Sequence, residues 1–211
     1  MAATQIQTLT RARAVTHATT RIAGVLFFVL AAGFLTVIML AASMAPGYDL
    51  SGGAISDLGG ISETAFLFNI TLVGVGVLNI AGGYLFFRAH GRPWILALFG
   101  LAGLGAIGAG LVPLGTSDLH GLFALVAFLF FNLEAIACAV VVTGPMRWVS
   151  LVGGLLGLVY VVIMVIGDAG NPGIFGPIGH GGAERMIVYP AMLWMVAFGG
   201  FLMGAPADTA E

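Results

Sequence analysis

The stretch IAGVLFFVLAAGFLTVIMLAASMA, residues Ile22–Ala45, runs for 24 residues without one charged side chain. A helix needs about 20 consecutive apolar residues to cross the hydrocarbon core of a bilayer. The apolar core of a secretory signal is shorter, about 7–15 residues. Although Ser43, Met44 and Ala45 resemble a cleavage site, we therefore predict an uncleaved first membrane helix.

The composition of the whole chain agrees with a membrane environment. Hydrophobic residues make up 60% of the 211 residues and charged residues only 8%. A soluble domain is usually about 45–50% apolar and about 25% charged. The net charge of −2 and the absence of lysine argue against a nucleic-acid partner. The single cysteine, Cys138, can form no internal disulfide.

Six apolar runs are long enough to span a bilayer, and none alternates strictly between apolar and polar residues. Because lipid admits only helices and closed barrels, we predict an all-α polytopic protein with six transmembrane helices. The runs are Ile22–Ala45, Thr64–Phe87, Pro93–Val112, Leu119–Thr143, Arg147–Gly167 and Glu184–Gly204. Residues 1–21 are expected to form a mobile N-terminal arm, residues 22–204 the transmembrane domain, and residues 205–211 a polar tail.

The arginines predict how the helices are oriented. Six of the seven lie before the first run or in the second and fourth connections, and positive residues mark the cytoplasmic side. These six are Arg11, Arg13, Arg21, Arg88, Arg92 and Arg147. We therefore expect a multi-pass protein of the cell membrane with both termini in the cytoplasm.

A glycine-rich stretch, GGAISDLGG at Gly52–Gly60, lies in the first outer connection and surrounds one carboxylate, Asp57. Glycine permits close approach of backbone or ligand. Two interpretations remain open. In the first, Ser56 and Asp57 only satisfy nearby N–H groups in a turn. In the second, Asp57 points into a cavity at the outer face and binds a ligand there.

Other polar residues occur at the same level of the membrane, and each has a structural interpretation beside a functional one. Asp118 can cap a helix, Glu184 suits a first helical turn, and Arg185 can reach lipid head groups. If the second, fourth and sixth helices adjoin, these residues could converge with Asp57 on one site. The candidate ligand-binding residues are Ser56, Asp118, His180, Glu184, Arg185 and Tyr189, and the candidate catalytic residues are His120 and Asp57.

No metal or cofactor is expected. Histidines and carboxylates are possible metal ligands, but the candidates lack a tight ligand spacing, and the sequence contains no phosphate loop or nucleotide-binding fingerprint. The glycine series Gly100–Gly110, GLAGLGAIGAG, and the pairs Gly153/Gly157 and Gly200/Gly204 indicate close helix packing instead. Such glycine-rich faces could also support a homo-oligomer.

Two polar residues should meet in the middle of the membrane. Glu134 lies about 14 residues beyond His120, and Asn79 lies about 15 residues beyond the start of the second run, so both are about 21 Å deep. We predict a hydrogen bond between them, with a proton or ion relay as the alternative.

Three stretches resemble the prokaryotic domain-of-unknown-function family 998. They are ISDLGG…FLFN in Ile55–Asn69, GLVPLGTSDLHGLFALVAFLFF in Gly110–Phe131, and GGAERMIVYPAMLWMVAFGGFLM in Gly181–Met203. The resemblance implies a six-helix integral membrane protein and no established activity. Residues Ile55–Gly59 and His120 are also distantly similar to the eukaryotic Frag/DRAM-type membrane family, which implies a link to remodelling of lipid anchors.

These observations favour a lipid-handling protein, enzyme or binder, with a polar pocket at the outer membrane face and membrane lipids as partners. In that hypothesis Asp57 anchors or polarises the lipid, His120 is the acid or base, and Arg185 holds an anionic head group. A small transporter and a structural or assembly protein without catalysis remain as alternatives.

Overall fold

The computed structural model describes the backbone of residues 2–204 and the side chains of residues 15–204. Within these residues the chain forms six long helices and two short 3₁₀ helices, and no strand. The long helices are α1 (Ala2–Met44), α2 (Ala65–His90), α3 (Pro93–Leu111), α4 (Leu119–Cys138), α5 (Pro145–Asp168) and α6 (Gly179–Met203). All six are long and apolar enough to cross a membrane, which confirms the all-α, six-span prediction.

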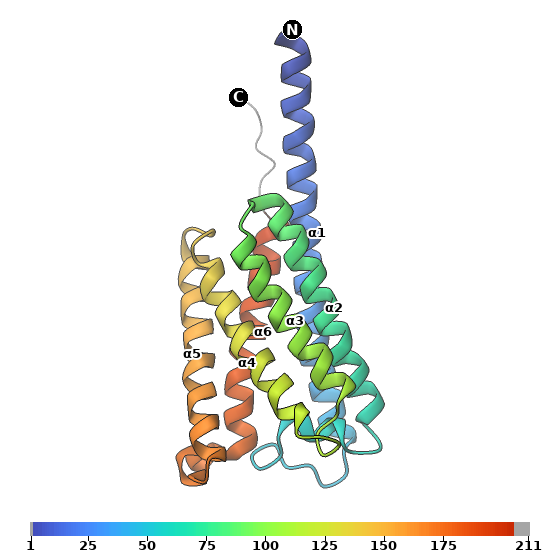
Figure 1. The fold of residues 1–211 in the computed structure, drawn as a ribbon, viewed down its shortest axis with the longest axis vertical. Helices are drawn as coiled ribbons and strands as arrows, with labels where there is room; N and C mark the ends of the chain where they lie inside the picture. The colour runs from blue at the N-terminus through green and yellow to red at the C-terminus, as the bar shows by residue number, and fades with distance from the viewer. Residues whose placement is uncertain (1, 205–211) are drawn as a thin grey trace.

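The helices form one antiparallel bundle, in which each helix packs against the next and α6 also packs against α1 (Figure 1). The two 3₁₀ helices, η1 (Ile55–Gly59) and η2 (Pro172–Ile178), lie in the first and last connections. These connections lie with the α3–α4 connection at one end of the bundle, the lower end in Figure 1. We call this the loop end, and we call the opposite end, where α2 meets α3 and α4 meets α5, the arginine end.

Proline and glycine set several of these helix boundaries. Pro93 and Pro145 occupy the first positions of α3 and α5, where a missing N–H costs nothing because that group has no partner inside the helix. Gly91 ends α2 in the left-handed conformation, with a φ of 68°, which glycine adopts without a steric penalty. Short connections at the arginine end follow from these sharp stops.

The start of α6 and the end of α4 differ from the sequence prediction. Helix α6 begins at Gly179 rather than Glu184, so Glu184 lies in the second turn and not the first. The glycines before it do not break the helix, because it is held by packing against the neighbouring loop. Helix α4 ends at Cys138, and residues 139–141 form turns instead of continuing the helix to Thr143.

The ends of the chain were predicted as an arm and a tail. Residues 2–21 form the first turns of α1, because this stretch contains neither glycine nor proline and is rich in residues that tolerate a helix. The tail, residues 205–211, lies outside the described residues.

Small residues bring neighbouring helices into close contact, as the glycine series predicts. A Cβ added at Gly103 of α3 would lie 2.6 Å from the carbonyl oxygen of Gly76 in α2. Gly154 and Gly157 of α5 likewise leave no room for a side chain against Asn132 of α4. Gly200 is different, since a Cβ there would meet no atom within 4 Å, and it packs against no other helix of the chain.

Candidate ligand-binding site

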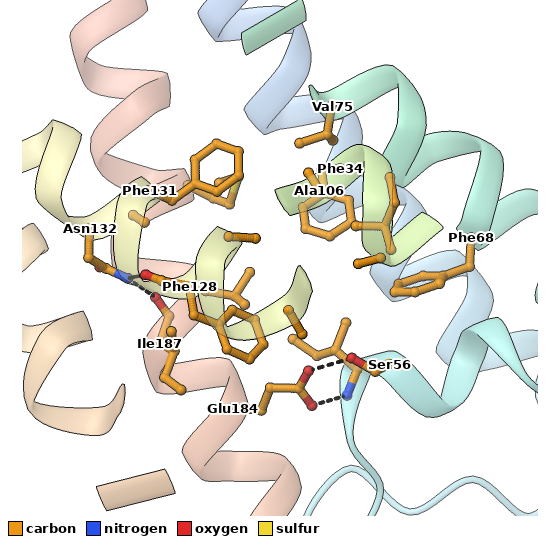
Figure 2. A pocket seen from close by; sticks show the side chains of 18 residues that line it. Phe34, Ser56, Phe68, Val75, Ala106, Phe128, Phe131, Asn132, Glu184 and Ile187 are labelled. Carbon is orange, nitrogen blue, oxygen red and sulfur yellow. Dashed lines mark hydrogen bonds between the residues drawn. The ribbon is translucent and has the colours of Figure 1, made fainter. Parts of the chain in front are cut away.

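The first connection, residues 45–64, is held on α6 by a buried carboxylate. The Glu184 side chain is only 3% exposed. One of its oxygens accepts a hydrogen bond of 2.6 Å from the Ile55 N–H, and the other accepts one of 2.9 Å from the Ser56 hydroxyl (Figure 2). A buried carboxylate requires such donors. We refer to residues 45–64 as the α1–α2 loop.

The neighbouring residue, Arg185, holds the same loop through its guanidinium group. Nη1 donates to the carbonyl oxygens of Leu50, Gly53 and Gly181 at 2.8, 3.0 and 2.8 Å. Nη2 donates to the Tyr48 hydroxyl at 2.6 Å. Among the described residues no carboxylate lies within salt-bridge distance of this arginine. Its terminal nitrogens are therefore committed to the loop.

Tyr48, which sequence reasoning missed, completes this attachment. Its hydroxyl donates to the Ala54 carbonyl oxygen at 2.7 Å. Burial raises the pKa of the Tyr48 phenol above its ordinary value, while the hydrogen bond from Arg185 acts in the opposite direction. The neutral hydroxyl can therefore both accept from Arg185 and donate to the loop. An aromatic hydroxyl just before a glycine-rich stretch was the only available signal in the sequence.

Glycine is needed on the helix as well as in the loop. A Cβ at Gly181 would overlap the Gly53 carbonyl oxygen, so the loop backbone packs directly on the first turn of α6. The Gly181 N–H also donates to the Ser51 carbonyl oxygen at 2.9 Å. This close backbone contact explains the glycines at both places.

The Asp57 carboxylate makes a local contact, accepting a hydrogen bond of 2.8 Å from the Ala54 N–H three residues earlier. This is the contact by which the third residue of a helix caps its first N–H groups, here at the start of η1, and it supports the structural interpretation of the residue. That Asp57 also lies close to His120 and Arg185 stays a prediction.

A recess about 400 Å³ in volume, counted as space open to the centre of a water molecule, opens beside the loop between α4 and α5. We call it the α4–α5 recess. Four of the predicted site residues border it together: Ser56, His120, His180 and Glu184. The other bordering residues are Ala54, Leu114, Gly121, Ala124, Leu125, Phe128, Met164, Val165 and Asp168. The structure therefore brings half of the eight predicted residues into one concave site.

His120 is nearly buried, with 4% of its surface exposed. Its Nδ1 lies 2.7 Å from the carbonyl oxygen of Val112, so this nitrogen carries a proton and donates. In the neutral ring the other nitrogen, Nε2, is then a hydrogen-bond acceptor. Nε2 is buried and has no partner among the described residues.

Across the recess, Nε2 of His180 lies 3.2 Å from a carboxylate oxygen of Asp168 at the end of α5. Asp168 is a further residue that the sequence analysis did not select. Asp118, Arg185 and Tyr189 do not border the recess. Asp118 occupies the N-cap position of α4 without a side-chain cap bond, and Tyr189 packs against the hydrophobic core ten residues into α6.

A second, narrower cavity of about 50 Å³ by the same measure lies deeper, among α1, α2, α3, α4 and α6. Its walls are mainly phenylalanine, alanine and aliphatic side chains, and Figure 2 shows Phe34, Phe68, Phe128 and Phe131 around it. Ser56, Ala124, Phe128 and Glu184 border both spaces. The recess, with its few polar side chains, is therefore separated from the apolar inner cavity by a single layer of side chains.

The mid-membrane pair lies one helical turn beyond this cavity. Nδ2 of Asn79 donates to a Glu134 carboxyl oxygen at 3.2 Å and to the Phe99 carbonyl oxygen at 3.1 Å. Both side chains are fully buried. The predicted hydrogen bond is confirmed. The second carboxyl oxygen of Glu134 and the amide oxygen of Asn79 have no partner among the described residues.

The described residues contain no group of three or more histidine, cysteine, aspartate or glutamate side chains placed to hold a metal ion. The recess instead offers a hydrogen-bond acceptor, a hydroxyl and two carboxylates beside apolar walls. This arrangement suits the binding of an amphiphile.

Comparison with known protein families gives one match, to the model of a protein of unknown function, DUF998, over residues 28–200. The chain belongs to the DUF998 family. The match confirms the resemblance seen in the sequence motifs, and it includes every residue that borders the recess. No curated protein and no solved structure matches the chain.

Proposed function

We propose that this DUF998 protein binds a membrane lipid in the α4–α5 recess, with the lipid head group at the loop end. The observation that supports it most is the polarity of the recess along its depth. His120, Asp168 and His180 lie at the loop end, whereas Phe128 lies eight residues, or about 12 Å, further along α4. A lipid has the same order of polar and apolar parts.

The position of the recess also favours a lipid over a water-soluble ligand. Leu125 of α4 and Val165 of α5 border the recess and are 41% and 52% exposed. On membrane-spanning helices, such exposed aliphatic side chains face the hydrocarbon. A lipid could therefore enter sideways from the bilayer. The volume lies within the range of about 300–1,000 Å³ that is usual for small-molecule sites.

The arginine distribution supports an orientation for this site. Because cytoplasmic loops are rich in arginine and lysine, the arginine end of the bundle belongs in the cytoplasm. The loop end, with the recess, then belongs at the outer face of the cell membrane, and both termini belong inside.

Filling the recess tests the proposal. A Cβ added at Gly121 meets no atom within 4 Å, so Gly121→Leu places a side chain in the recess without a core clash. We expect purified wild-type protein to retain lipid in native mass spectrometry, and Gly121→Leu to lose most of it. Gly200→Leu is the matched control, because Gly200 is also helical and unobstructed but lies on α6 away from the recess.

Equal lipid retention in the Gly121 and Gly200 variants would remove the recess as the binding site. The structural alternative, in which the loops only cap helices, would then take first place.

A further inference from the structure

We propose that the recess selects a lipid whose head group is uncharged and offers a hydroxyl donor, and that it discriminates against anionic head groups. This inference rests on the proposed function and adds the chemical class of the ligand. It follows from the hydrogen-bonding capacity and the charge of the side chains that surround the recess.

The hydrogen-bonding capacity of His120 favours a head group that donates a hydrogen bond. Its Nδ1 hydrogen is used by the Val112 carbonyl oxygen, and the remaining Nε2 is a buried acceptor without a partner among the described residues. An unpaired buried acceptor carries a desolvation cost that a donor removes. Because Nε2 has almost no accessible surface, a head-group hydroxyl reaches it only with a small movement of the recess wall. It then supplies such a donor, whereas a fully ionised phosphate oxygen can only accept.

The charge around the recess disfavours an anionic head group. Two carboxylates border the recess, the buried Glu184 and the exposed Asp168, which lies 3.2 Å from Nε2 of His180, and no arginine borders it. The chain contains no lysine. The two histidines are the only other titratable groups on its walls. Since like charges repel more strongly where water is scarce, an anionic head group is disfavoured here.

Arg185 is the one cation that could reverse this charge balance, and the fold already uses it to hold the loop. Arg185 is the only arginine at the loop end among the described residues. Its terminal nitrogens donate to three loop and helix carbonyls and to Tyr48. Nε of Arg185 is buried and has no partner among the described residues, and a phosphate that took over the terminal nitrogens would release the α1–α2 loop. The sequence-based hypothesis that Arg185 holds an anionic head group is therefore replaced by a structural role in this proposal.

Two lipids with the same acyl chains test the inference, because dioleoylglycerol ends in a hydroxyl where dioleoyl phosphatidic acid carries a phosphate. Binding to the full-length protein in detergent is measured by thermal stabilisation across a lipid titration. We expect dioleoylglycerol to bind at least about tenfold more tightly. His120→Ala should weaken dioleoylglycerol binding about fivefold, the effect of one neutral hydrogen bond.

His90→Ala is the matched control for His120→Ala. His90 also uses Nδ1 on a carbonyl oxygen, that of Phe86, but it lies at the arginine end of the bundle. It should leave both affinities unchanged. Asp168→Asn removes the exposed carboxylate of the recess and should raise the affinity for phosphatidic acid severalfold relative to that for dioleoylglycerol.

Equal or tighter binding of phosphatidic acid that is still lost in Gly121→Leu overturns the head-group inference and leaves the proposed lipid site intact. Dioleoylglycerol binding that is insensitive to His120→Ala also overturns it. If neither lipid binds in a manner sensitive to Gly121→Leu, the proposed function fails together with this inference.

Discussion

The contact between Asn79 and Glu134 could be predicted from the depth of each residue along its helix. Each residue lies about 21 Å from the loop-end start of its helix, and a polar group in hydrocarbon needs a partner at its own depth. The structure joins the two side chains at 3.2 Å. The depth came from the sequence, but the second acceptor, the Phe99 carbonyl oxygen on α3, depends on which helices adjoin and could not be counted.

This pair gives a stability prediction. Glu134→Ala leaves the Asn79 amide with one acceptor fewer and creates a cavity, so it should lower stability by about 2–4 kcal/mol. Glu134→Gln keeps an amide oxygen for Asn79 and should cost less than about 1 kcal/mol. Thermal unfolding of the purified protein in detergent measures both. Equal damage from the two substitutions would favour a charge role, such as a proton relay, over a hydrogen bond.

At the scale of elements, the α1–α2 loop shows where sequence reasoning stops. The glycines predicted a loop able to bend towards other helices, and its contacts with Gly181 and Glu184 confirm that it lies on α6. Hydrophobic periodicity says nothing about a loop path, so the sequence could not tell which acid would receive the Ile55 N–H. It assigned ligand roles to Glu184 and Arg185, and the structure places both side chains in contacts that hold the loop.

This attachment predicts local opening when its acceptor is removed. Glu184→Ala leaves the Ile55 N–H and the Ser56 hydroxyl unpaired. A hydrogen bond to a carboxylate contributes about 1.5–3 kcal/mol, so amide exchange at Ile55 should accelerate at least about tenfold. Hydrogen–deuterium exchange of residues 54–58 measures this, and Glu184→Gln, which keeps one oxygen acceptor, should give an intermediate rate.

The control for that experiment is Glu63→Ala in the same loop. The Glu63 carboxylate is exposed and bonds the adjacent Ser62 hydroxyl and its own backbone N–H, neither of which touches Ile55, so exchange at Ile55 should not change. Unchanged exchange in Glu184→Ala would mean that burial of Ile55 and Leu58, rather than Glu184, keeps the loop closed.

For the whole molecule, a 60% hydrophobic composition indicated a membrane protein, and the six apolar runs, each long enough to span a bilayer, predicted six membrane helices. The lateral arrangement was not available from composition. Helix α5 borders the outer recess through Met164 and Val165 but does not border the inner cavity. The packing of α5 beside α4 and α6 creates a space whose walls reach the exposed surface of the bundle at Leu125 and Val165.

The orientation of the bundle is the prediction on which the outer-face position of the recess depends. Gly173 in η2 is exposed at the loop end and has open space for a side chain, and Thr143 is exposed at the arginine end. In a Cys138→Ala background, which removes the buried native thiol, single cysteines at these positions report the two sides.

Since the arginine end should be cytoplasmic, an impermeant maleimide applied to intact cells should label Gly173→Cys. Thr143→Cys should react only after the membrane is opened. The reverse pattern would place the recess, and any lipid in it, at the cytoplasmic face.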